Sequence, residues 1–272
     1  LTMTATPIPR TLALTLYGDL DLSTLDEMPE GRLKIATFVV SNSKRNKAYN
    51  FIEEQVKGER QTFIITPFVE PSETMTSVKA ATQEFEKLKT KFAKSVNIGL
   101  LHGKLKSKEK EAVIKKFQKG KIDILVATPV VEVGIDIPNA TVMMIESAER
   151  FGLAQLHQLR GRVGRGKHKS YCFLFTDSNS PISLKRLKSM EKLDSGAELA
   201  QIDLKMRGSG EIFGLRQSGF INLKIADISD RKAVSRVQNE AKKIIETDPS
   251  LGKFPLLSQK LGKFQSEYIQ PN

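Results

Sequence analysis

The chain has 272 residues, 39% of them hydrophobic, so it can bury one large core or two modest ones. Lysine and arginine total 43 against 31 acidic residues, and the resulting net charge of +12 favours a polyanionic partner such as nucleic acid. The single Cys172 excludes an internal disulfide framework, and no apolar run is long enough to cross a membrane. These features predict a soluble cytoplasmic protein without a membrane partner.

Residues 1–32 differ in composition from the rest of the chain. The stretch "TATPIPR" carries Pro7 and Pro9, and "DEMPEGR" at 26–32 is rich in turn residues. We expect residues 1–32 to be the end of one domain plus a linker. The chain begins with Leu1 rather than Met, which predicts a fragment of a longer polypeptide.

Residues 33–177 alternate short β-branched runs with helical patterns, as a parallel sheet with helices on both faces requires. A further sign is the apolar spacing of Val78, Ala81, Phe85, Leu88 and Phe92, which predicts a buried helix face. A second helix is expected to start with Ser107 as N-cap and to bury Val113, Ile114 and Phe117. The sequence therefore predicts an α/β fold with one doubly wound sheet. Its six strands are expected at residues 34–40, 61–66, 96–101, 122–128, 141–146 and 170–175.

Residues 178–272 form a mainly helical extension in this interpretation. Pro181 stands at a plausible first helical position, and apolar residues follow at every third position. A further helix near 230–247 is expected to bury Val234, Val237, Ala241, Ile244 and Ile245. The tail after Asp248 has weak periodicity and supports no assignment. Cys172 lies in the apolar run "YCFLF" and is expected to be a small buried hydrophobe.

The segment "QLHQLRGRVGRGK" at 155–167 gathers three arginines among three glycines. Arginine keeps its proton at working pH and presents a rigid fork of donors, which suits phosphate. If a helix from about Gly152 includes the segment, Arg162 and Arg165 share one face. The alternative is a solvated basic helix end. The glycines let the backbone approach either a ligand or a neighbouring element.

Other candidate residues follow expected strands. Thr128 and Asp136 lie in "ATPVVEVGIDIPNA", where Thr128 could donate to a phosphate and Asp136 accept from a ribose hydroxyl, or serve only as a turn residue. His102 and Gly103 begin a loop with four nearby lysines that could meet nucleic-acid phosphates, or be only a solvated face. No residues match the Walker A pattern or a zinc or magnesium set, so the chain carries at most half of a nucleotide site.

In their order and spacing, "TATPIPR", "LLHG", "ATPVVEVGIDIPNA" and "QLHQLRGRVGRG" resemble motifs III, IVa, V and VI of superfamily 2 helicases. The opening stretch and "DLKMRGSGEIFGLRQSGF" at 203–220 narrow the resemblance to the RecG and Mfd group, with RecG-like proteins favoured. The resemblance implies a second RecA-like motor domain at 33–177 and a translocation (TRG) motif within 178–272. It also implies that a wedge domain and an ATP-cradling first motor domain precede the chain.

The resemblance also implies residue roles. Arg162 and Arg165 would be arginine fingers for the γ-phosphate of ATP, with Mg²⁺ held mainly by the first motor domain, and Gln158 would couple that cleft to motif III. Asp136 would meet the ribose, and Gly134, also placed at the nucleotide, would lie near the DNA-tracking face. The residues expected to contact DNA or couple ATP hydrolysis to movement are Thr4, Ala5, Thr6, His102, Gly103, Thr128, Arg207, Glu211, Arg216 and Gln217.

The implied activity is ATP-dependent remodelling of branched double-stranded DNA, such as stalled forks and Holliday junctions, by a monomer. The fragment alone is expected to be inactive as an ATPase. Two alternatives stay open: an Mfd-like translocase that acts on RNA polymerase, and a non-catalytic basic module that binds nucleic acid. Pro129 departs from the family pattern and removes a backbone donor at that position.

Overall fold

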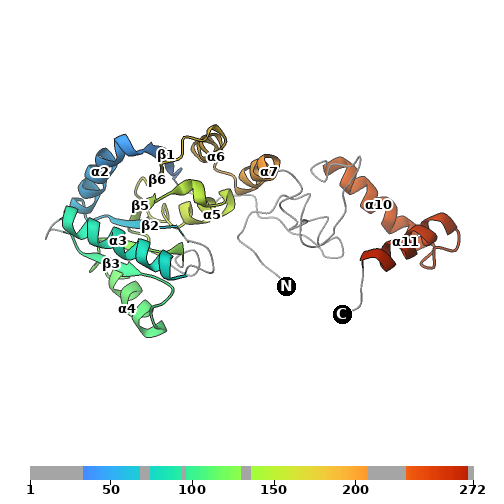
Figure 1. Ribbon diagram of the computed structural model, residues 1–272, viewed down its shortest axis with the longest axis horizontal. Helices are drawn as coiled ribbons and strands as arrows, with labels where there is room; N and C mark the ends of the chain where they lie inside the picture. The colour runs from blue at the N-terminus through green and yellow to red at the C-terminus, as the bar shows by residue number, and fades with distance from the viewer. Residues whose placement is uncertain (1–32, 68–73, 93–95, 130–135, 208–230, 269–272) are drawn as a thin grey trace. The chain divides into compact units, whose positions relative to one another are not determined.

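The computed structural model describes residues 33–67, 74–92, 96–129, 136–207 and 231–268. These fall into two compact units, one reaching to Leu199 and the other beginning at Ala200. Figure 1 shows the helices and strands, most of them with labels. None of the described helices is long and apolar enough to cross a membrane.

The first unit is built on one sheet whose neighbouring strands all pair in parallel. The strand order is β1-β6-β5-β2-β4-β3. The middle strands are buried along their whole length, which explains their continuous apolar sequence. The bounds are Ala36–Ser41 (β1), Gln61–Ile65 (β2), Ile98–Leu101 (β3), Ile124–Ala127 (β4), Ala140–Ile145 (β5) and Tyr171–Thr176 (β6).

Helices cover both faces of this sheet. Ile52 of α2 (Arg45–Lys57) and Leu88 of α3 (Thr74–Phe92) pack in one apolar cluster with residues from β2, β4, β5 and β6. On the other face, Phe117 of α4 (Ser107–Gln118) meets Phe63 of β2 edge-on, with ring centroids 5.0 Å apart. Successive strand residues point to opposite faces, so Phe63 and its neighbour Ile64 serve different layers.

The predicted fold is confirmed. All six strands lie within a few residues of their predicted positions, and the sheet is parallel with helices on both faces. One detail is wrong: Ser107 is not the N-cap of α4. Lys106 takes that position, and its backbone N–H donates to Oε2 of Glu109 at 2.8 Å, so the helix starts one residue earlier than expected. Phe117 is fully buried, whereas Val113 and Ile114 are half-buried.

Helix α6 (Pro181–Lys192) begins with the predicted proline and lies along strand β1. Glu191 accepts a hydrogen bond from the backbone N–H of Val39 at 2.6 Å, which satisfies a donor on this edge strand. Helix α7 (Gly196–Arg207) comes after a short link. Cys172 is fully buried as predicted, and this burial raises the pKa of its thiol to about 12.

The described part of the second unit includes α10 (Arg231–Thr247) and α11 (Pro255–Tyr268). The predicted burial along α10 is wrong: Val237 is 68% and Ile245 58% exposed, Ala241 is also exposed, and Ile244 is half-buried. Apolar periodicity predicts an amphipathic helix, but burial also requires a partner surface. The side chain of Val234 lies outside the described set.

Candidate functional site

The arginine-glycine segment begins in helix α5 (Leu153–Arg160), whose three leucines are fully buried. The helix ends at Arg160, earlier than the sequence suggested. Past it, the backbone N–H of Arg162 still donates to the Leu159 carbonyl at 3.0 Å, and then the chain turns away. The proposed helical spacing of Arg162 and Arg165 is therefore wrong, because Gly161 caps the helix before either residue.

The next two glycines in the segment permit close approach to neighbouring elements. Gly164 has φ +73°, and a Cβ there would lie 2.9 Å from Cγ1 of Ile35. At Gly166 a Cβ would lie 2.4 Å from the carbonyl oxygen of Pro138. Of the two options left open by the sequence, the structure shows the contact with neighbouring elements. Gly166 thereby holds the segment directly against the chain that comes after Asp136.

Two predicted site residues are in direct contact. Nη1 of Arg165 lies 3.1 Å from Oδ1 of Asp136, and Nε of Arg165 donates to the Gly161 carbonyl at 3.2 Å. The side chain of Arg165 is 32% exposed and that of Asp136 is 65% exposed. Both remain accessible to a ligand. Gln158 and Arg162, which precede Arg165 in the chain, are half-buried. Each of them also makes polar interactions.

Predicted residues also follow strands β3 and β4, which are neighbours in the sheet. The backbone N–H of Thr128 donates to the Leu101 carbonyl at 3.1 Å, but the Thr128 side chain is buried, and Oγ1 has no hydrogen-bond partner among the described residues. Nδ1 of His102 is likewise buried and has no hydrogen-bond partner among the described residues. Burial and the charges of Lys110 and Lys104 lower the pKa of His102, so its imidazole is neutral at pH 7.

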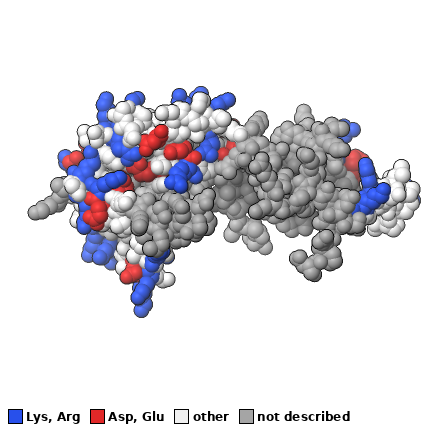
Figure 2. All heavy atoms as spheres, viewed as in Figure 1, with Lys and Arg blue, Asp and Glu red and all other residues white. Residues whose placement is uncertain are grey.

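Not all four lysines that follow His102 and Gly103 point into solvent. Nζ of Lys110 donates to the Gly103 carbonyl at 2.8 Å, so this lysine is directed back onto the loop. Lys104, Lys106 and Lys108 are exposed. On the face shown in Figure 2, basic side chains of the first unit are spread around its outline among acidic ones, so they do not form one continuous basic patch there.

Several predicted residues have no described side chain. Arg207 is the last residue of α7, and only its backbone is described. The others lie outside the described residues: Thr4, Ala5, Thr6, Gly134, Glu211, Arg216 and Gln217.

Sequence reasoning missed a second polar cluster at the carboxyl edge of the sheet. Arg45 donates from Nη1 to Oε1 of Glu146 at 2.6 Å and from Nη2 to Oε2 at 2.8 Å, and Nη1 also reaches the Tyr49 hydroxyl. Burial raises the pKa of Glu146, and the two bonds from Arg45 oppose that effect. The only signal was an acidic residue ending an apolar run, since a buried carboxylate requires a partner.

This ion pair forms one wall of a cleft of about 600 Å³. Lys87, Lys91 and Arg150 also line it, together with Glu84 and Asp177. Cations and carboxylates line the cleft in nearly equal number, so it does not have the large excess of one charge sign that recognition of an anion would need.

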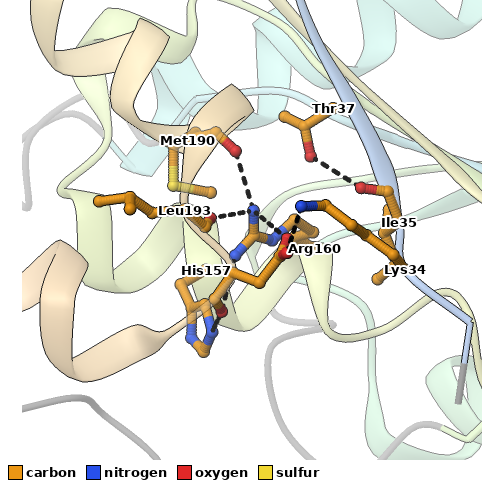
Figure 3. A network of polar contacts seen from close by, with 8 residues as sticks. Lys34, Ile35, Thr37, His157, Arg160, Met190 and Leu193 are labelled. Atoms are coloured by element: carbon orange, nitrogen blue, oxygen red, sulfur yellow. Dashed lines mark hydrogen bonds and ion pairs between the residues drawn. The ribbon is translucent and has the colours of Figure 1, made fainter.

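Arg160 is almost completely buried, with 4% of its side chain exposed. It donates to the main-chain carbonyls of Met190, Leu193 and Asp194 at 2.9, 2.9 and 3.1 Å (Figure 3). Its distance to Oδ1 of Asp194 is 3.9 Å. Arg160 therefore has a structural position, distinct from the accessible position of Arg165.

Two family models match this chain. Residues 43–167 match the helicase conserved C-terminal domain, and residues 193–270 match domain 3, C-terminal, of the ATP-dependent DNA helicase RecG. The ATP-dependent DNA helicase RecG of Synechocystis sp. is 49% identical over 96% of this chain, and that of Bacillus subtilis is 45% identical over 90%. This chain belongs to the RecG helicase family. It spans 31% and 36% of the length of those two relatives.

A solved structure of RecG bound to a three-way DNA junction has the same fold. It superposes with a TM-score of 0.68 at 43% identity, covering 85% of this chain and 30% of that one. These matches favour RecG over the Mfd-like alternative. The Arg165–Asp136 contact therefore joins two segments of a RecG-family helicase C-terminal domain.

Proposed function

We propose that this chain is the C-terminal motor part of an ATP-dependent DNA helicase that remodels branched DNA in recombination and repair. The observation that carries the proposal is the 3.1 Å contact between Arg165 and Asp136, which brings residues of motifs V and VI together. Both side chains are partly exposed, as contact with a nucleotide would require. The junction bound by the RecG relative supports branched DNA as the substrate class.

In this proposal Arg162 and Arg165 place permanent positive charge at the γ-phosphate of ATP, where negative charge develops during transfer. Asp136, with Gly134 nearby in sequence, receives the ribose, and Gln158 links this site to motif III. ATP and Mg²⁺ are held mainly by a first motor domain of the same polypeptide, because nothing in the 272 residues matches the Walker A pattern.

DNA contact is proposed at the carboxyl ends of β3 and β4. His102, Gly103 and Thr128 lie there, and the buried hydroxyl of Thr128 would need its surroundings to rearrange before it met a phosphate. Residues 33–177 are proposed as the second RecA-like domain and 178–272 as the extension with the translocation motif. We further propose a cytoplasmic monomer.

The test is Arg165→Ala in the full-length protein. Loss of an arginine finger lowers the turnover number for ATP by about 10³ to 10⁵-fold, and we expect junction affinity to be retained. Lys57→Ala is the control, since it removes an exposed cation of α2 that pairs with Glu53 at 3.0 Å, far from the motif segments in the sequence. Unchanged ATPase activity in Arg165→Ala would remove the assignment.

A second experiment addresses the split site. We expect the 272-residue chain by itself to hydrolyse ATP negligibly with or without junction DNA. Robust DNA-stimulated hydrolysis by this chain would contradict the proposal that the phosphates are held by another domain.

A further inference from the structure

The contacts of Arg160 extend beyond helix α5. Its guanidinium donates hydrogen bonds to three main-chain carbonyls at the end of α6. They belong to Met190 in α6, Leu193 at its C-cap and Asp194 in the link to α7. The last carbonyls of a helix have no partner within the helix and carry its negative dipole end. Arg160 supplies both the donors and the opposite charge.

Only arginine has the geometry for this task. A guanidinium presents donors in a fixed planar fork, whereas a lysine has one ammonium at the end of a flexible stem. The two Nη atoms of Arg160 bind three acceptors at 2.9 to 3.1 Å. A shift of the link by a fraction of this distance would break at least one bond, so the arrangement fixes the link relative to α5.

Two other side chains hold the same link. Nε2 of His157, in α5, contacts the Asp194 carbonyl at 3.2 Å, and Nζ of Lys34 lies 2.7 Å from Oδ2 of Asp194 (Figure 3). Asp194 is therefore contacted both from α5 and from the residues before β1. Helix α7 begins at Gly196, directly after this link, and its last residues, 203–207, belong to the stretch at 203–220 that resembles the translocation motif.

We propose that Arg160 is a positioning residue that makes the α6–α7 link move together with the last turn of α5. Because Arg162 and Arg165 come after that turn in the chain, a displacement of the segment at the nucleotide is transmitted through Arg160 to the start of α7. This inference rests on the proposed function. It assigns to the buried arginine a task different from that of its two neighbours.

The experiment is Arg160→Lys in the full-length protein, measuring ATP hydrolysed per branched DNA molecule unwound. We expect ATPase activity within about twofold of the wild type and unchanged junction affinity, but about tenfold less unwinding per ATP, because one ammonium cannot replace the fork. Arg60→Lys is the control. Lys34→Ala is a milder variant that removes only an exposed contact, and we expect a smaller loss of the same ratio.

Hydrogen exchange of the amides between Leu193 and Leu199 provides a second measurement. In the wild type, a non-hydrolysable ATP analogue should change their exchange, and in Arg160→Lys this change should be lost. A merely structural residue would alter the baseline exchange but keep the response to the analogue. Retained response and unchanged unwinding per ATP in both variants would overturn the inference. A wild type that hydrolyses ATP without unwinding DNA would instead contradict the proposed function, while the exchange measurement still tests Arg160.

Discussion

Replacing Asp136 by alanine separates two tasks that this carboxylate could perform: holding Arg165 and binding the ribose. The ion pair is partly exposed, and such pairs contribute about 0.2 to 1 kcal/mol, so its loss changes the availability of Arg165 by at most about fivefold. A hydrogen bond from a ribose hydroxyl to a carboxylate contributes about 1.5 to 3 kcal/mol, or about ten- to 150-fold. The two tasks therefore differ in magnitude.

The assay compares kcat/KM for ATP and for 2′,3′-dideoxy-ATP in DNA-stimulated hydrolysis by the full-length protein. If Asp136 binds the ribose, the wild type prefers ATP by about tenfold or more, and Asp136→Ala loses most of this preference. Glu53→Ala is the matched control, because it breaks an exposed ion pair with Lys57 on α2, far from the motif segments in the sequence. An equal preference for ATP in Asp136→Ala and wild type would refute the ribose assignment and leave Asp136 as a partner of Arg165.

Three further predictions concern stability. Glu146→Ala leaves the guanidinium of Arg45 partly buried without its carboxylate. We expect the free energy of unfolding, measured by urea denaturation, to fall by about 3 kcal/mol. A loss below about 1 kcal/mol would contradict the argument that the buried pair stabilises the fold. Gly166→Ala forces a Cβ against the Pro138 carbonyl and should cost about 1 to 3 kcal/mol, with an unchanged melting temperature as the contrary result. The pKa of His102 is lowered in the folded state, so as pH falls the unfolded chain takes up this proton before the folded chain does. The contribution of His102 to the free energy of unfolding is therefore present above the unfolded pKa of about 6.5 and is lost as pH falls below it. Unfolding midpoints between pH 7.5 and 5.5 should therefore fall less steeply in His102→Gln, and equal slopes would show that His102 does not contribute.

Much of the sheet could be predicted because its strands are buried on both faces and so have continuous apolar sequences. The strand containing Met143 and the one containing Cys172 could be located in this way. The role of the glycines after α5 was harder to predict, because "RGRVGRG" suits approach to a ligand and approach to a neighbouring element equally. Only the positions of Ile35 and Pro138 show that Gly164 and Gly166 pack against neighbouring elements.

Long-range polar pairs could not be predicted from spacing. Arg45 and Glu146 are far apart in the sequence and meet because α2 and the end of β5 lie at the same sheet edge. The burial of α10 also could not be predicted, since a periodic apolar face does not specify what covers it. The Arg165–Asp136 contact was implied only through the family resemblance, which assigned both residues to one nucleotide.

The hydrogen bond from Val39 to Glu191 limits which part of the extension can move. Strand β1 is an edge strand, and an uncovered edge is a template for pairing with other chains. Helix α6 covers this edge and supplies the carboxylate that accepts from Val39. If α6 moved away from β1 during an ATPase cycle, each turnover would expose an edge strand that can pair with other chains. We therefore expect α6 to stay on β1 while the link at 193–195 and the start of α7 are displaced. A chain shortened to end before Pro181 should be prone to self-association.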